Sequence, residues 1–162
     1  MSEDLEIRRD RMRFSKNTLS SRLALLAIVF DVLYFISIYK SDVGTYYYTI
    51  LIGASIIYNL IFLLTAFLSS EGVKNYKRVY SIVLIILGLI QIGRIFIIPW
   101  QAHQAVVKVA GVDTVVMGDA QFIRVIIYLA GSAACLIAAA VINLKKSRAL
   151  AAHLAARNAG QA

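Results

Sequence analysis

The chain has 162 residues, of which 60% are hydrophobic and 16% charged, with a single proline. A soluble domain of this length could not bury so much apolar surface, because small domains leave a large share of their surface exposed. The formal net charge of +8 would suit nucleic acid or a membrane topology, so the positions of the basic residues decide between them.

Four apolar runs are long enough to cross the hydrocarbon core of a bilayer, which takes about 20 helical residues. The sequence therefore predicts an all-α integral membrane protein built as a four-transmembrane-helix bundle. In chain order the predicted segments are an N-terminal segment at 1–18, a transmembrane domain at 19–144 with spans at 19–39, 45–69, 79–99 and 121–144 and a loop at 101–120, and a basic tail at 145–162.

Most basic residues outside the spans lie in the N-terminal segment, in the connector between the second and third spans, and in the tail. The other two loops hold one basic residue each, Lys40 and Lys108. Lys and Arg stay on the cytoplasmic side of a membrane, so we expect both termini to be cytoplasmic, in a plasma membrane of bacterial type. This distribution accounts for the net charge without a nucleic-acid partner.

The loops carry signals of their own. Tyr46, Tyr47 and Tyr48 are typical of an aromatic belt at the membrane surface, with a saccharide-stacking site as the alternative. In the connector SEGVKNYKR, Gly72 is expected to stop the second helix.

The loop at 101–120 contains VVKVAGVDTVVM, a segment dense in β-branched residues and broken by Gly111 and Asp113. Such a pattern favours a small outer β-hairpin. An isolated two-stranded hairpin is marginal in water, so it should rest on the membrane surface or on another chain.

The fourth span contains AGSAACLIAAA, and its small residues would let helix backbones approach closely. The residues expected to form this packing face are Gly131, Ser132, Ala134 and Ala138. Two explanations stay open: packing within the bundle, and packing against another protein.

Each span also carries polar residues near its middle. At a helical rise of about 1.5 Å per residue, Asp31, Asn59, Gln91 and Arg94 lie between about 15 and 22 Å from the cytoplasmic ends of their spans, and Ser132 of the fourth span lies at a similar depth. Helices in lipid turn such residues toward one another, so these side chains are expected to form one intramembrane polar cluster.

Within that cluster we predict a salt bridge between Asp31 and Arg94, with Asn59 and Gln91 completing the hydrogen bonds, because an unpaired charge at this depth costs about 3 kcal/mol or more. The alternatives for Arg94 are to extend its side chain to the membrane surface near Trp100, or to contact another subunit. The alternatives for Asp31 are a protonated acid or a bond to a partner chain.

Motifs for catalysis are not found: the sequence has no G-x-S-x-G, no H-E-x-x-H and no phosphate loop. Cys135 is the single cysteine, and topology places His103 and His153 on opposite sides of the membrane. We therefore expect no enzyme activity, no metal site and no cofactor.

Two functional hypotheses follow. The first is a small accessory subunit that packs against and stabilises or regulates a larger membrane protein, such as a transporter, because this explains the small residues and the loop together. The alternative is a small proton-coupled transporter or channel that works as a homo-oligomer through Asp31. Its topology resembles that of the small multidrug exporters, but an acid neutralised by Arg94 makes a poor proton carrier.

Overall fold

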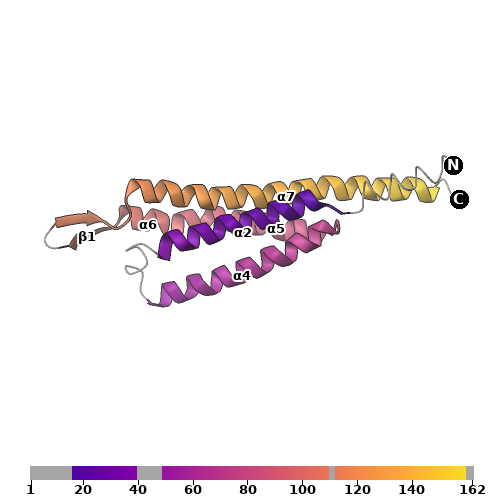
Figure 1. The fold of residues 1–162 in the computed structure, drawn as a ribbon. Coiled ribbons are helices and arrows are strands. Elements are labelled where there is room, and N and C mark those ends of the chain that lie inside the picture. The colour runs from indigo at the N-terminus through magenta and orange to yellow at the C-terminus, as the bar shows by residue number, and fades with distance from the viewer. Residues whose placement is uncertain (1–15, 40–48, 110–111, 160–162) are drawn as a thin grey trace.

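The computed structural model describes residues 16–39, 49–109 and 112–159. Figure 1 shows long helices that run side by side, with a strand pair at one end and one helix that projects past the other end. The elements are α2 (Thr18–Tyr39), α4 (Thr49–Lys74), α5 (Arg78–Ile97), α6 (Pro99–Gln104), β1 (Val106–Val109), β2 (Val112–Val115) and α7 (Asp119–Ala159).

Four segments of these helices are long and apolar enough to cross a membrane. They are Thr18–Ile38, Gly53–Lys74, Arg78–Gln104 and Asp119–Ala159. The prediction of an all-α membrane protein with four spanning helices is confirmed in this coarse form. The predicted belt at Tyr46–Tyr48 and most of the N-terminal segment lie outside the described residues.

The third and fourth helices end elsewhere than the predicted spans. The third span is two helices, because α5 ends at Ile97 and Pro99 starts α6 at a position where its fixed φ and missing N–H are tolerated. The fourth helix is 41 residues long and continues without a break to Ala159, through most of the predicted tail.

Gly72 does not stop the second helix, so that expectation was wrong. The helix continues to Lys74 and ends with Tyr76 in a left-handed conformation at φ 58°. The N–H of Lys77 donates to the carbonyl of Gly72, and the N–H of Tyr76 donates to that of Val73, as in a Schellman motif. Gly72 is needed for another reason: a Cβ there would clash with the ring of Tyr80.

Small residues let the helices pack closely in the interior. A Cβ on Gly88 of α5 would lie 2.9 Å from the side chain of Ile137 on α7, and one on Gly131 would lie 3.2 Å from the ring of Phe30 on α2. Many large apolar side chains point outward, as on α4, where Leu60 is 63% exposed, while others such as Phe62 and Leu136 are buried in the interior. This arrangement suits a bundle that is surrounded by lipid, because exposing apolar side chains to lipid has no free-energy cost.

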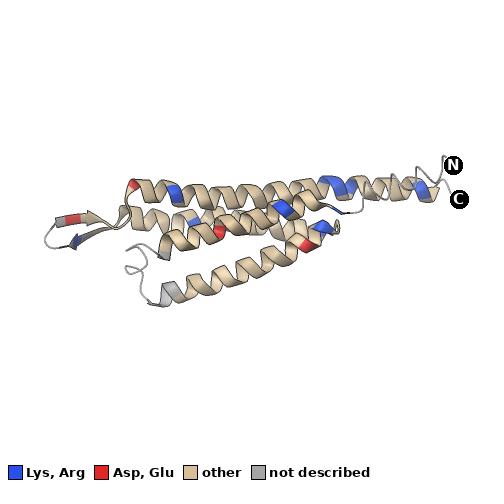
Figure 2. Cartoon of the chain, in the orientation of Figure 1, with Lys and Arg blue, Asp and Glu red and all other residues tan. Residues whose placement is uncertain are grey.

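The two strands pair antiparallel within the loop between α6 and α7, with Val106 opposite Val115 and Val109 opposite Val112. The N–H of Val116 donates to the carbonyl of Ala105 and extends the ladder by one bond. We call the end of the bundle that carries the strands the strand end. The opposite end, where α4 ends and α5 begins, is called the basic end, because most of the lysines and arginines of the described residues lie there (Figure 2).

Candidate functional site

The four side chains of the predicted polar cluster meet inside the bundle. Asp31 comes from α2, Asn59 from α4, and Gln91 and Arg94 from successive turns of α5. Their exposed fractions are 1% for Asp31, 4% for Asn59, 0% for Gln91 and 7% for Arg94. The cluster therefore joins three helices through side chains that are buried in the bundle.

Arg94 is the centre of the cluster. Its Nη1 lies 2.7 Å from Oδ1 of Asp31 and forms the predicted salt bridge. The same nitrogen donates to Oε1 of Gln91 at 2.9 Å, and Nη2 donates to Oδ1 of Asn59 at 2.9 Å. Since the guanidinium is buried and turned toward Asp31, it does not extend to the level of Trp100.

Gln91 links this group to the fourth helix. Its Nε2 donates to Oδ1 of Asp31 at 2.8 Å and to Oγ of Ser132 at 3.4 Å. Ser132 in turn donates to the carbonyl of Ala27 on α2 at 3.0 Å. One connected hydrogen-bond network thus includes all four spanning helices.

Two tyrosine rings cover the guanidinium. The Cζ of Arg94 lies 4.6 Å from the ring centre of Tyr34 and 4.5 Å from that of Tyr58, both within cation–π range. Tyr34 stands three residues after Asp31, on the same face of the first span, but Tyr58 was missed by sequence reasoning. Its signal was a tyrosine in the middle of a span, whereas lipid-facing tyrosines prefer the membrane surface.

The cluster is balanced in charge, because one carboxylate faces one guanidinium. Removing either partner would leave an uncompensated buried charge, at a cost of about 3–5 kcal/mol. Arg94 supplies no nucleophile, and Asp31 is held by two donors. This chemistry is that of a structural clasp between helices.

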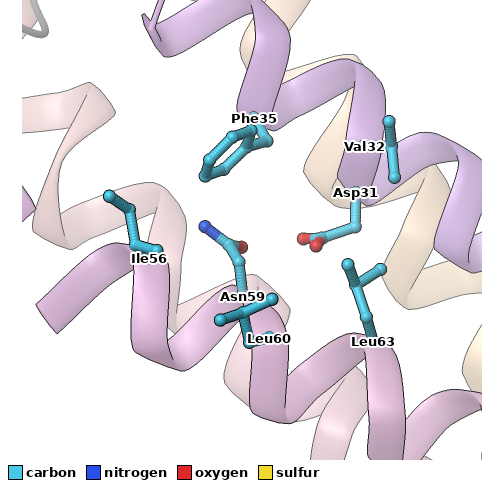
Figure 3. Close-up of a pocket in the computed structure, with 7 residues that line it drawn as sticks. All are labelled: Asp31, Val32, Phe35, Ile56, Asn59, Leu60 and Leu63. Atoms are coloured by element: carbon cyan, nitrogen blue, oxygen red, sulfur yellow. The ribbon is translucent and has the colours of Figure 1, made fainter. Parts of the chain in front are cut away.

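Two cavities adjoin the clasp, one on each side of α4. The smaller has a volume of about 130 Å³ and lies between α2 and α4, and Figure 3 shows the carboxylate of Asp31 and the amide of Asn59 facing it. The larger has a volume of about 390 Å³, and Tyr34, Tyr58 and Arg94 are among its lining residues.

Polar atoms next to these cavities are left unpaired. Arg94 donates a hydrogen bond to the side-chain oxygen of Asn59, which fixes the orientation of the Asn59 amide. The Nδ2 of Asn59 therefore points away from Arg94 and has no hydrogen-bond partner among the described residues. The hydroxyl of Tyr58 is likewise buried without a partner there. Buried donors of this kind are uncommon in folded proteins.

A second buried polar network lies at the basic end, and sequence reasoning missed it. Asn143 of α7 donates to Oγ of Ser81 at 2.7 Å and accepts from Nδ2 of Asn17 at 3.0 Å. The backbone N–H of Asn17 donates to the carbonyl of Lys74 at 2.9 Å. The available signal was that Asn17, Ser81 and Asn143 all stand close to the same ends of their predicted spans.

The small residues predicted on the fourth span divide between two faces. Gly131 and Ser132 pack within the bundle, against Phe30 and Ala27 of α2. Ala134 is exposed and Ala138 is partly exposed. The interior contacts therefore account for half of the predicted set, and the other half lies on the outer face of α7.

The described residues contain no group of three or more His, Cys, Asp or Glu side chains that could hold a metal ion. His103 stacks on Phe122 at 4.2 Å between ring centres, and its Nδ1 lies 3.2 Å from the carbonyl of Met117. The first contact ties α6 to the start of α7 and the second ties it to the segment between β2 and α7, which is a structural use of the histidine.

No protein-family model matches this sequence, and comparisons with curated proteins and with solved structures give no match.

Proposed function

We propose that the chain is a non-catalytic membrane subunit that binds a transmembrane helix of a larger membrane protein through the outer face of α7. It stabilises or regulates that protein, which in our proposal is a transporter. The orientation proposed with this function has both termini in the cytoplasm and the strands on the opposite side of a plasma membrane.

The outer face of α7 carries the proposal. Ala130 and Ala134 are exposed and Ala138 is partly exposed at helical spacing along this face, with the exposed Ile127 and Val141 on either side. Figure 1 shows that this helix runs along the whole bundle. We define these five residues as the outer stripe.

The outer stripe differs from the other lipid-facing surfaces of the molecule. The exposed side of α4 consists of large side chains such as Leu60, Ile61 and Leu64, whose exposed fractions are about 60%. In lipid, small side chains allow a second helix to come close enough for backbone packing, whereas large ones form an adequate surface against acyl chains. A run of alanines is thus the expected surface for a helix partner.

The length of α7 gives independent support. The helix continues for 15 residues beyond Leu144, about 22 Å at 1.5 Å per residue. Lys145 and Arg148 extend the outer stripe beyond Val141, and Leu154 is 47% exposed. A helical extension of this length is marginal by itself in water, so a partner would stabilise it.

The polar cluster fits the same function. It holds three helices together by a charge-balanced network, which gives the subunit a fixed shape without chemistry of its own. The strands offer a second contact, because Val106 and Val115 are exposed and an isolated hairpin needs a surface to rest on.

The experiment is affinity purification of the tagged full chain from its native membranes in mild detergent. The unaltered chain should purify together with a stoichiometric amount of a larger membrane protein. The Ala134→Leu variant should purify without it, because the larger side chain keeps the partner helix from packing against α7. Gly53→Leu is the matched control: it adds the same bulk on α4, where nothing lies within 4 Å of a new Cβ. A partner that survives Ala134→Leu, or a chain that purifies only as a homo-oligomer, contradicts the proposal.

One observation favours the alternative, a small proton-coupled transporter or channel. Asp31 is among the residues that line the smaller cavity. The purified chain alone in liposomes would then move a lipophilic cation in response to a pH gradient, and Asp31→Asn would abolish that uptake. The accessory function predicts no uptake by the chain alone.

A further inference from the structure

The larger cavity has the size and lining of a ligand site. Its volume of about 390 Å³ lies within the range of small-molecule pockets, about 300–1,000 Å³. Ile90 and Ile97 of α5 give it apolar walls, and Ser55, Tyr58 and Arg94 contribute a few polar groups. Figure 1 shows that α4 diverges from α2 toward the strand end.

Arg94 and Tyr58 supply hydrogen-bond donors to this cavity. Arg94 uses three of the five N–H groups of its guanidinium to donate to Asp31, Gln91 and Asn59, so it has two further N–H groups. The hydroxyl of Tyr58 has no partner among the described residues. Both side chains line the cavity, and both are hydrogen-bond donors.

The charge of the site limits which ligand it can bind. Arg94 is already neutralised by Asp31 at 2.7 Å, so an anion would bring an uncompensated negative charge into a buried region. A cation would be unfavourable as well, because Arg94 and Tyr58 present hydrogen-bond donors to the cavity and a cation needs acceptors. A neutral ligand avoids both costs.

We propose that the larger cavity binds a neutral, lipid-soluble molecule whose carbonyl oxygen accepts hydrogen bonds from Tyr58 and Arg94 and whose apolar body lies between α4 and α5. A ketone, a quinone or the ester group of a neutral lipid has this chemistry. The site is separate from the outer stripe of α7, so it adds a ligand to the subunit.

Photolabelling of the purified full chain tests this proposal. The probe is a benzophenone with a decyl chain, in which the neutral ketone is also the reactive group. It should label peptides of α4 and α5 that line the cavity. A twelve-carbon methyl ketone should compete with it, and the matching carboxylate and the matching alkane should compete about tenfold less well, because they lack a neutral acceptor.

Two variants place the ligand in the cavity. Gly93 lines it, and nothing lies within 4 Å of a Cβ added there, so Gly93→Leu should fill the space without disturbing the clasp and abolish the labelling. Gly53→Leu adds the same side chain in another open position that does not line the cavity and should leave labelling unchanged. Tyr58→Phe keeps the ring and removes the hydroxyl, which should weaken competition by the ketone about tenfold.

The outcomes distinguish a site that recognises a carbonyl oxygen from a groove that any lipid acyl chain can occupy. Equal competition by the alkane would show a groove for any acyl chain and would overturn the role of the oxygen. Labelling that persists in Gly93→Leu, or that falls on other helices, would overturn the location. Mass spectrometry of an organic extract of the purified chain then distinguishes a quinone from an ester lipid as the native source.

Discussion

Arg94 and Asp31 show how single side chains set the interior of this protein. The guanidinium would be costly in lipid by itself, and its exposed fraction of 7% leaves it no route to water. Asp31 neutralises it, Asn59 and Gln91 use more of its donors, and two tyrosine rings cover its faces. The pair is stable because each buried charge faces its counter-charge at 2.7 Å.

Replacing Arg94 by Ala should destabilise the protein by about 3–5 kcal/mol, because Asp31 then remains buried without its counter-charge. Asp31→Asn in the same background should restore most of that loss, since no charge remains to compensate. Thermal unfolding in detergent, followed by the amount of monodisperse protein, measures both effects. Losses that simply add in the double variant would show that the two residues act independently.

Depth and helical spacing predict the contact between Asp31 and Arg94 from sequence, because charges in lipid have few ways to be neutralised. The same reasoning misses Tyr58, since an aromatic residue in a span also reads as lipid-facing. It misses the network of Asn17 and Asn143 because uncharged polar groups near span ends can reach water, and only the packed helices show that they are buried.

At the scale of helices, close packing at glycines fixes how the elements meet. A glycine followed by basic residues is a pattern that predicts a helix end, and at Gly72 this prediction was wrong. In the structure the end comes later, at Tyr76, and Gly72 gives room for the ring of Tyr80 as α5 begins. A contact between two helices cannot be read from one helix alone.

Gly72→Ala should therefore destabilise the α4–α5 connection by about 1–3 kcal/mol through overpacking against Tyr80. Tyr80→Ala should remove the clash, so the double variant should lose no further stability when Gly72 is replaced. Thermal unfolding of the single and double variants measures this coupling. The account of Gly72 fails if the alanine costs the same with and without the tyrosine ring.

The four spanning helices could be predicted from the sequence, because a continuous run of about 20 apolar residues has the length and composition of a membrane-spanning helix. The break between α5 and α6 and the full length of α7 could not be placed as well. Pro99 ends one helix and starts the next at almost the same position. The predicted boundary at 144 marks where the apolar sequence ends and polar sequence begins. The backbone hydrogen bonds of α7 continue across this point, so the helix does not end there.

The whole molecule has an uneven distribution of charge along its length. Figure 2 shows most lysines and arginines gathered at the basic end, where Glu71 lies beside Lys74, whereas fewer basic residues lie toward the strand end. Basic residues near span ends favour the cytoplasmic side, which is the basis for the proposed orientation. The bundle also presents different surfaces around its circumference, with large side chains on α4 and alanines on the outer stripe.

Cysteine labelling tests the orientation in intact cells. In a Cys135→Ala background, Lys108→Cys should react with a membrane-impermeant maleimide, because the strands are proposed to lie outside. Arg148→Cys should react only after the membrane is permeabilised. The reverse pattern would place the basic end outside and would overturn the proposed topology.

The central claim is that the outer stripe of α7 binds another membrane protein. A photoreactive residue in place of Ala134, irradiated in native membranes, tests it most directly, with the same residue in place of Leu64 on the exposed side of α4 as control. We expect an adduct with one larger membrane protein from position 134, lost when Ala130→Leu is added, and no such adduct from position 64. Adducts only with lipid, only with a second copy of the chain, or equally from both positions would contradict the account.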